Sequence, residues 1–222
     1  MTNAILKLCI SSGPRGPGDG RKLIALVLAV VFGLCAQSVL AEEVKKPQEL
    51  LKELCDKEGD AHFKGGIIFG KDHAYVLTAP KGWVLDNQSG VDQGIHAVFY
   101  PEGGSWSDSK AVMYSRINDK TDKTFQEVID FDLKHMSQDA PNYKIEEKDP
   151  VTCTRGAKAH IKYLSGDRFN TFEAVGYIEE PKKVITIVMT SRDEKNFKSS
   201  VDAFYELVKS YFWMTDQVKI EK

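Results

Sequence analysis

The sequence predicts an α+β fold in which a mostly antiparallel β-sheet is covered by helices. Two stretches, 124–138 and the segment after Ser191, carry apolar residues at helical spacing. The segments around them are short, rich in β-branched and aromatic residues, and joined by turns of Gly, Pro, Asn and Asp. Short turns join antiparallel neighbours, whereas parallel strands need long crossovers. Two amphipathic helices are then available to cover the faces of one layered sheet.

The composition is that of a globular protein. Of 222 residues, 42% are hydrophobic and 28% charged, and the formal net charge is −2. These values exclude a disordered or collagen-like chain. They also argue against nucleic acid as a partner, because such proteins carry a strongly basic surface. A polytopic membrane protein is excluded as well, since only one long apolar stretch is present.

Residues 1–41 have the pattern of a secretory signal peptide. A basic segment, 1–22, precedes the uncharged stretch 23–36, and Val39-Leu40-Ala41 ends it with small residues at the required spacing. We expect cleavage after Ala41, a periplasmic or secreted protein, and no stable membrane insertion after cleavage. Two alternatives stay open: an uncleaved membrane anchor over Leu23–Ala41, and a lipoprotein with its acyl chains on Cys35.

The rest of the chain is expected to form one domain between two polar ends. Residues 42–63 form a polar lead and a short helix near 47–57, marked by Pro47 and by Leu50, Leu51 and Leu54. The α+β domain spans 64–214, and 215–222 is a polar tail. Without residues 1–41 the chain has 26 basic and 31 acidic residues, a net charge of −5.

The first half of the domain alternates strands and turns. Residues 67–69 and 74–78 are predicted strands, and Pro80-Lys81-Gly82-Trp83 is a turn. Two further strands, 95–100 and 111–117, flank a loop of turn-forming residues at 101–109.

The second half opens with the helix 124–138, on which Phe125, Val128, Ile129, Leu133 and Met136 share one face. Strands are then predicted at 143–147 with 151–154, and at 157–164, 169–178 and 183–190. Ser191 and Glu194 have the spacing of a capping box that opens a second helix. The apolar run 211–214 at the end of that helix either closes the core or forms an exposed patch.

The segment HAYVLTAPKGW, residues 73–83, resembles the opening strand and Pro-x-Gly-Trp turn of PsbP-like domains. The last strand and final helix, with Phe197, Phe204 and Tyr211, are similar too, and the resemblance covers roughly 64–214. It implies an antiparallel sheet between helices and a non-catalytic accessory or binding protein. The matched positions look like fold determinants, so no functional residue is carried over from the family.

Cys55 and Cys153 are the cysteines left after signal cleavage. Export brings them into an oxidising compartment, where a disulfide can persist. A bridge closing a loop of about 100 residues would contribute on the order of 4 kcal/mol. The alternative, two separate buried thiols, stays open. No zinc-type spacing of Cys and His is present, and we expect no cofactor.

Catalytic and metal-binding patterns are weak. Ser107 and Lys110 match S-x-x-K of penicillin-recognising enzymes, but neither S-D-N nor K-T-G follows. A serine hydrolase is therefore a remote alternative, and the chain is expected not to be an enzyme. His96 and His160 lie in predicted strands and could face one another, which gives a small-molecule or metal-binding protein as the main alternative.

Trp106 is the most informative single residue, because it lies in a polar loop between Ser105 and Ser107. An exposed aromatic on a loop is a common anchor for a partner. Its alternative position is folded back over the edge of the sheet. We therefore expect an exported accessory protein that binds a protein partner or stabilises a cell-envelope assembly, with Ser105, Trp106 and Ser107 as the contact.

Overall fold

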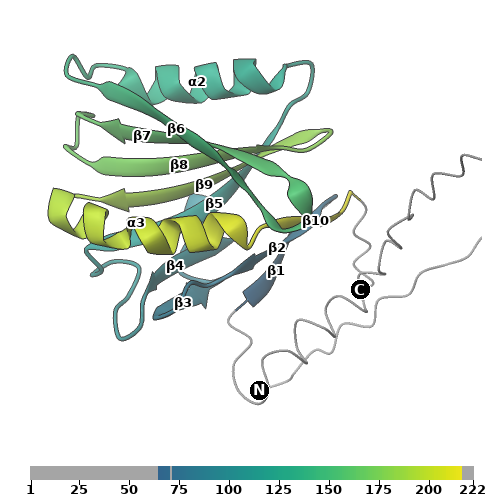
Figure 1. Ribbon diagram of the computed structural model, residues 1–222, viewed down its shortest axis with the longest axis horizontal. Helices are drawn as coiled ribbons and strands as arrows, with labels where there is room; N and C mark the ends of the chain where they lie inside the picture. The colour runs from purple at the N-terminus through teal and green to yellow at the C-terminus, as the bar shows by residue number, and fades with distance from the viewer. Residues whose placement is uncertain (1–64, 71, 217–222) are drawn as a thin grey trace, which may run out of the picture. The chain divides into compact units, whose positions relative to one another are not determined.

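The computed structural model describes residues 65–70 and 72–216 (Figure 1). The predictions for the signal peptide, the polar lead, the helix near 47–57 and Cys55 lie outside the described residues. Within 65–70 and 72–216, no helix has the length and apolar character needed to cross a membrane.

The described chain forms strands, two α-helices and two short 3-10 helices. Their bounds are β1 (Gly65–Phe69), β2 (Ala74–Thr78), β3 (Trp83–Asp86), η1 (Val91–Gln93), β4 (Ala97–Pro101), β5 (Ala111–Asp119), α2 (Phe125–Ser137), β6 (Lys144–Thr152), η2 (Thr154–Gly156), β7 (Lys158–Ser165), β8 (Phe172–Glu179), β9 (Lys183–Ser191), α3 (Glu194–Lys209) and β10 (Phe212–Thr215).

The described residues form two sheets, and the pairings within both are antiparallel. Seven strands follow the order β3-β4-β5-β9-β8-β7-β6, and three follow the order β1-β2-β10. The β5–β9 ladder at the centre runs without interruption from Ala111 opposite Ser191 to Asp119 opposite Lys183. The predicted α+β class, a mostly antiparallel sheet with covering helices, is confirmed.

Three details differ from the prediction. β3 was not predicted, because a four-residue strand after the Pro-Gly turn is too short for a clear period. The two strands predicted between 143 and 154 form one strand, β6, with an irregularity between Lys148 and Val151 beside Pro150. The apolar run after α3 forms the strand β10, which pairs with β2 and completes the second sheet.

The helix starts follow from their caps. Thr124 caps α2 in a full capping box with Glu127, so this helix begins where the sequence predicted. The capping box predicted at Ser191 is wrong. α3 begins after Asp193, whose carboxylate accepts the Asn196 backbone N–H at 3.0 Å. Ser191 is instead the last residue of β9, and its hydroxyl donates to the Lys110 carbonyl at 2.8 Å.

One face of the seven-stranded sheet packs against α3. Phe204 and Val208 of α3 are fully buried against the alternate residues of β7, β8 and β9. Gly176 in β8 allows the close approach, because a Cβ there would lie 3.3 Å from both the Ile161 and Val208 side chains.

The three-stranded sheet covers the remainder of this face. Tyr75 and Leu77 of β2 belong to the same buried cluster as Trp83 and Phe99. The Tyr75 hydroxyl also lies 2.8 Å from the Ser115 hydroxyl in β5. The α3 face is therefore covered from β3 to β7.

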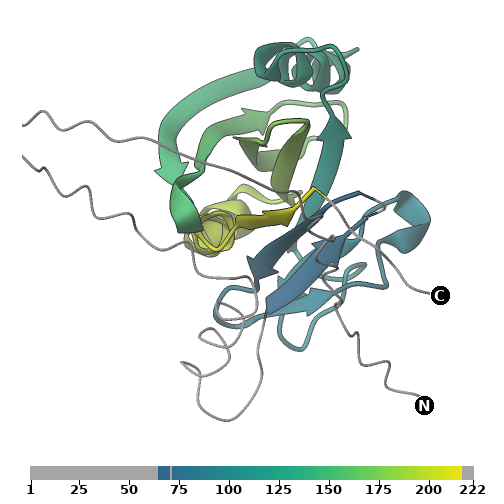
Figure 2. The same cartoon turned by 90° about the vertical axis from the view of Figure 1, so that its right-hand side faces the viewer.

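The opposite face packs against α2. Val128 and Ile129 are buried with the intervening residues of β7, β8 and β9, which are Leu164, Val175, Tyr177, Val184 and Val188. The Tyr177 hydroxyl donates to Asp132 of α2 at 2.7 Å. Figures 1 and 2 show α2 on the β6–β7 side of the sheet, away from β3 and β4.

Candidate functional site

On the α2 face, the buried cluster beneath α2 reaches only as far as Tyr114 of β5, and α2 does not extend over β3 and β4. Val98 of β4, opposite Tyr114 on this face, is fully buried beside Gly90 and Ile95 of the β3–β4 connection. The rest of this half of the face is open. Side chains alternate along a strand, so the residues that flank buried Met113 belong to this open half. Val112 and Tyr114 are partly buried there, and Arg116 is exposed. Val84 and Tyr100, opposite one another in β3 and β4, are also partly buried.

The loop between β4 and β5 holds Trp106 against this open half. The Ser105 hydroxyl accepts the Asp108 backbone N–H at 3.2 Å and donates to the Asp108 carboxylate at 2.8 Å. This turn brings the Trp106 ring edge-to-face with Tyr114 at a centroid distance of 6.0 Å. Trp106 is partly buried, whereas Ser107 is exposed and its hydroxyl lies 3.1 Å from that of Ser105.

Arg116 contacts the same tyrosine. Its guanidinium carbon lies 4.9 Å from the centroid of the Tyr114 ring, which is a cation–π geometry. The ion pairs of the described residues do not include Arg116. We call Tyr100, Trp106, Val112, Tyr114 and Arg116 the Trp106 surface.

The sequence reasoning identified Trp106 but missed Tyr114 and Arg116. The signal was present, because the predicted strand 111–117 alternates Ala111, Met113 and Ser115 with larger residues. What the sequence does not contain is that α2 covers this side of the strand only as far as Tyr114.

Glu173 in β8 lies beside the Trp106 surface, one strand beyond Thr190 of β9. Burial, together with the charges of the nearby Asp167 and Asp132, raises the pKa of this carboxyl to about 7. A hydrogen bond with Thr190 and the charge of Arg116 act in the opposite direction. Glu173 therefore changes charge near neutral pH.

Asp86 stabilises the other end of the open half. Its carboxylate accepts hydrogen bonds from the Ser89 hydroxyl, from the backbone N–H groups of Gln88 and Ser89, and from the Tyr100 hydroxyl at 3.0 Å. These bonds, that of the Ser89 hydroxyl foremost, lower the pKa of Asp86 to about 2. The Tyr100 ring is thereby fixed on the surface by an ionised group.

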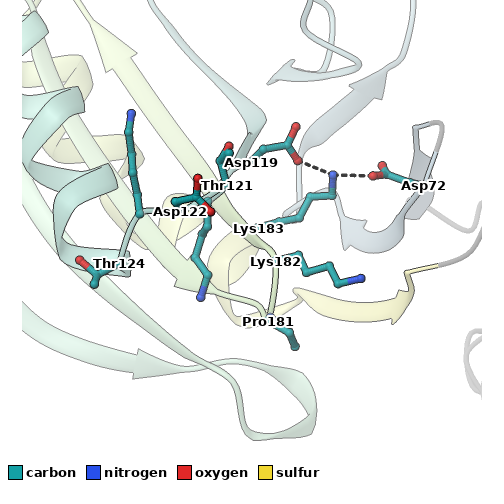
Figure 3. A pocket seen from close by; sticks show the side chains of 10 residues that line it. Asp72, Asp119, Thr121, Asp122, Thr124, Pro181, Lys182 and Lys183 are labelled. Atoms are coloured by element: carbon teal, nitrogen blue, oxygen red, sulfur yellow. Dashed lines mark hydrogen bonds and ion pairs between the residues drawn. The ribbon is translucent and has the colours of Figure 1, made fainter.

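A second feature is a polar cavity of about 690 Å³, shallow and wide open to solvent, between the β5–α2 connection and the β8–β9 turn (Figure 3). Lys183 is buried at its side, and its ammonium group lies 2.8 Å from Asp72 and 2.5 Å from Asp119. Asp72 lies in the β1–β2 connection of the smaller sheet and Asp119 ends β5 of the larger sheet, so Lys183 ties the two sheets together. Lys182 is exposed at the same cavity.

Ser107 and Lys110 do not form a catalytic pair in the structure. Both are exposed in a turn, and no hydrogen bond of the described residues joins them. The helical turn that places lysine next to serine in an S-x-x-K site is absent between 101 and 111.

His96 and His160 do not face one another, so this expectation is wrong. His96 precedes β4 and His160 lies in β7, with β5, β9 and β8 between these strands. At a strand spacing of about 4.8 Å they are separated by roughly 19 Å. His160 instead packs edge-to-face with Phe125 of α2. No cluster of three His, Cys, Asp or Glu residues suited to a metal ion occurs within 65–70 and 72–216.

Cys153 lies just before η2 and is buried in the α3-face cluster. Burial, with a smaller effect of Glu180, raises the pKa of its thiol to about 11. Its bridge to Cys55 stays a prediction, because Cys55 lies outside the described residues.

Comparison with known proteins finds similarity in structure alone. No protein family and no curated protein sequence matches the chain. The solution structure of cyanobacterial PsbP (CyanoP) from Synechocystis is similar with a TM-score of 0.45 and 17% identity, over 70% of this chain and 95% of that one. LpqN, involved in cell envelope biogenesis of Mycobacterium tuberculosis, has a TM-score of 0.47 and 11% identity, over 76% and 97%. The protein Mog1 has 0.43 and 12%, over 70% and 97%. A PsbP protein is thus among the similar structures, as the sequence resemblance led us to expect.

Proposed function

We propose that the chain is an exported, non-catalytic accessory protein that binds a protein partner in the cell envelope through the Trp106 surface. The observation that carries the proposal is the open half of the α2 face. It presents two tyrosines and an arginine on the strands β4 and β5, and Trp106 packs on Tyr114 from the β4–β5 loop. Trp, Tyr and Arg are the residue types enriched among the energetically dominant positions of protein interfaces.

Trp106 packs on Tyr114 with one part of its ring and leaves the rest accessible to a partner, so it is partly rather than fully buried. Its contact with Tyr114 orients the ring before any partner arrives, so little conformational entropy is lost on binding. Ser105 and Asp108 hold the turn on either side of Trp106. Ser105 and Ser107 accordingly contribute to the contact mainly by shaping and bordering the loop.

The test is in-cell crosslinking of the tagged chain, followed by purification and mass spectrometry. We expect a processed N-terminus at Glu42 and one stoichiometric protein partner. Trp106→Ala should reduce recovery of that partner by about 30-fold, the effect of losing a dominant interface residue worth about 2 kcal/mol.

Phe169→Ala is the matched control, since Phe169 is a loop aromatic that is 62% exposed and lies in the β7–β8 connection. It should leave recovery unchanged. Equal recovery with Trp106→Ala and wild type would refute the proposal, as would recovery of no protein partner.

A second candidate, small-molecule binding, is favoured by the cavity of Figure 3. Its volume of about 690 Å³ falls in the range of ligand sites, and lysines and aspartates line it. Titration with inorganic phosphate and with succinate should then raise the unfolding temperature of wild type but not of Lys182→Ala. Trp106→Ala should leave any such rise intact, which separates the two candidates.

A further inference from the structure

The chemistry of the Trp106 surface specifies its partner more closely, provided that the proposed function is correct. Arg116 sits on β5 one residue beyond Ser115, where the pairing with β4 ends, and the continuous ladder with β9 holds its backbone. The Tyr114 ring supports one face of the guanidinium, and Trp106 packs on the same ring. A guanidinium oriented in this way offers its fork of N–H donors in a fixed direction.

The charges around Arg116 leave its donors available. Its neighbour in the adjacent strand β9 is Thr186. The Thr186 hydroxyl lies 3.4 Å from the Asn118 side-chain nitrogen, and both of these groups are neutral. Glu173 is the acid that acts on it electrostatically, and it lies beyond ion-pair distance in the described chain. Asp132 and Asp167 lie close enough to Glu173 to raise its pKa. The hydroxyls of Tyr143 and Tyr177 lie near the same acids, which raise the pKa of both.

We infer that the partner presents a protein carboxylate to Arg116, next to an apolar side chain that packs on Trp106 and Val112. A carboxylate accepts two parallel hydrogen bonds from the guanidinium fork, and such charge-assisted pairs strengthen where aromatic groups exclude water. A single guanidinium matches the single charge of Asp or Glu. A phosphate dianion is instead usually bound by several cations.

The experiment places a photoreactive amino acid, p-benzoylphenylalanine, at Val112 and crosslinks in cells. Three backgrounds are compared with the parent: Arg116→Gln, Arg116→Lys and Arg168→Gln. Arg168 is the matched control, because its guanidinium carbon lies 4.6 Å from the centroid of the Phe169 ring in the β7–β8 connection, a similar cation–π pair. We expect Arg116→Gln to reduce the crosslinked partner by about tenfold or more, Arg116→Lys to reduce it less, and Arg168→Gln to leave it unchanged.

The crosslinked peptide is then mapped and synthesised, with its Asp or Glu replaced by Asn or Gln in a second peptide. Calorimetric titration of the parent chain should show about tenfold weaker binding of the neutral peptide. The same replacement should cause no further loss in the Arg116→Gln chain, because the two changes remove one interaction.

Four results would overturn the inference while leaving the proposed function in place. These are an undiminished crosslink in Arg116→Gln, a mapped peptide without Asp or Glu, a phosphorylated contact residue, and additive losses in the titration. A crosslink to lipid or to a second copy of this chain would overturn the inference too. Absence of any crosslink in the parent would refute the proposed function itself. Equal unfolding temperatures of the variants exclude misfolding as the cause.

Discussion

The two faces of the seven-stranded sheet are built from the same strands but are covered very differently. On one face, α3 and the three-stranded sheet together cover β3 to β7, and Phe99 and Ile187 are fully buried. On the other face α2 covers β7, β8 and β9, while Val112 and Tyr114 stay partly exposed. The difference separates two roles, because a fully covered face supplies stability and an uncovered aromatic face is available to a partner.

The largest effect is expected on the α3 face. Phe204→Ala removes a fully buried ring from the centre of the α3-face cluster and should lower the free energy of unfolding by about 3–5 kcal/mol. Urea unfolding monitored by circular dichroism measures this loss. Phe131→Ala on α2, where the ring is 65% exposed, is the control and should cost less than about 1 kcal/mol. Comparable losses in the two variants would contradict the assignment of stability to the α3 face.

The next effect concerns Glu173, at the border between the covered and open halves of the α2 face. Its pKa is raised from 4.5 to about 7, so the folded chain keeps a proton that the unfolded chain releases. Stability from this group is therefore present below pH 4.5 and is lost as pH rises to 7. At 1.36 kcal/mol per pKa unit the loss is about 3 kcal/mol.

Glu173→Gln should therefore match wild type at pH 4.5 and be more stable by about 3 kcal/mol at pH 8. Urea unfolding at the two pH values provides the measurement. Glu179→Gln, on the same strand and with its side chain 52% exposed, should change stability by less than about 1 kcal/mol at both. If Glu173→Gln has no advantage at pH 8, the carboxyl is not buried as described.

The sequence was most informative where a repeating pattern meets a cap. Helical spacing and the residues around Thr124 predicted α2 to within a residue at each end. The alternating strands from 157 to 190 also formed as expected. These features are local, and local propensity and burial favour the same structure there.

The elements that the sequence did not reveal depend on long-range pairing. β10 has the apolar composition of a helix end, and only its pairing with β2, more than a hundred residues earlier, makes it a strand. The separation of His96 from His160 follows from strand order, which no spacing in the sequence specifies. The Trp106 surface exists for the same reason, because the position of α2 leaves part of one face uncovered.

A smaller effect is expected from the aromatic residue of the open half. Trp106→Ala removes an edge-to-face interaction with Tyr114 and the burial of part of the indole ring, and should cost about 2 kcal/mol of stability. This is less than the cost expected for Phe204→Ala, although tryptophan is the larger side chain. Urea unfolding at pH 6 measures this loss of stability. A cost near that of Phe204→Ala would mean that Trp106 belongs to the core rather than to a binding surface.

The smallest effect on stability is expected for Arg116→Gln, although this variant should have the largest effect on binding of the partner's carboxylate. Within the chain this substitution removes an exposed cation–π pair at 4.9 Å, which is worth about 0.5–1 kcal/mol. Thermal unfolding is measured at pH 5, where Glu173 keeps its proton and its charge does not enter the comparison. Arg116→Gln and Arg168→Gln, which removes a similar pair with Phe169, should then agree within about 0.5 kcal/mol. A larger destabilisation by Arg116→Gln would mean that this arginine stabilises the fold. Equal stability of the two variants, with loss of the crosslink in Arg116→Gln alone, would assign Arg116 to partner recognition. The same substitution of arginine by glutamine would then weaken partner binding at one position and leave it unchanged at the other.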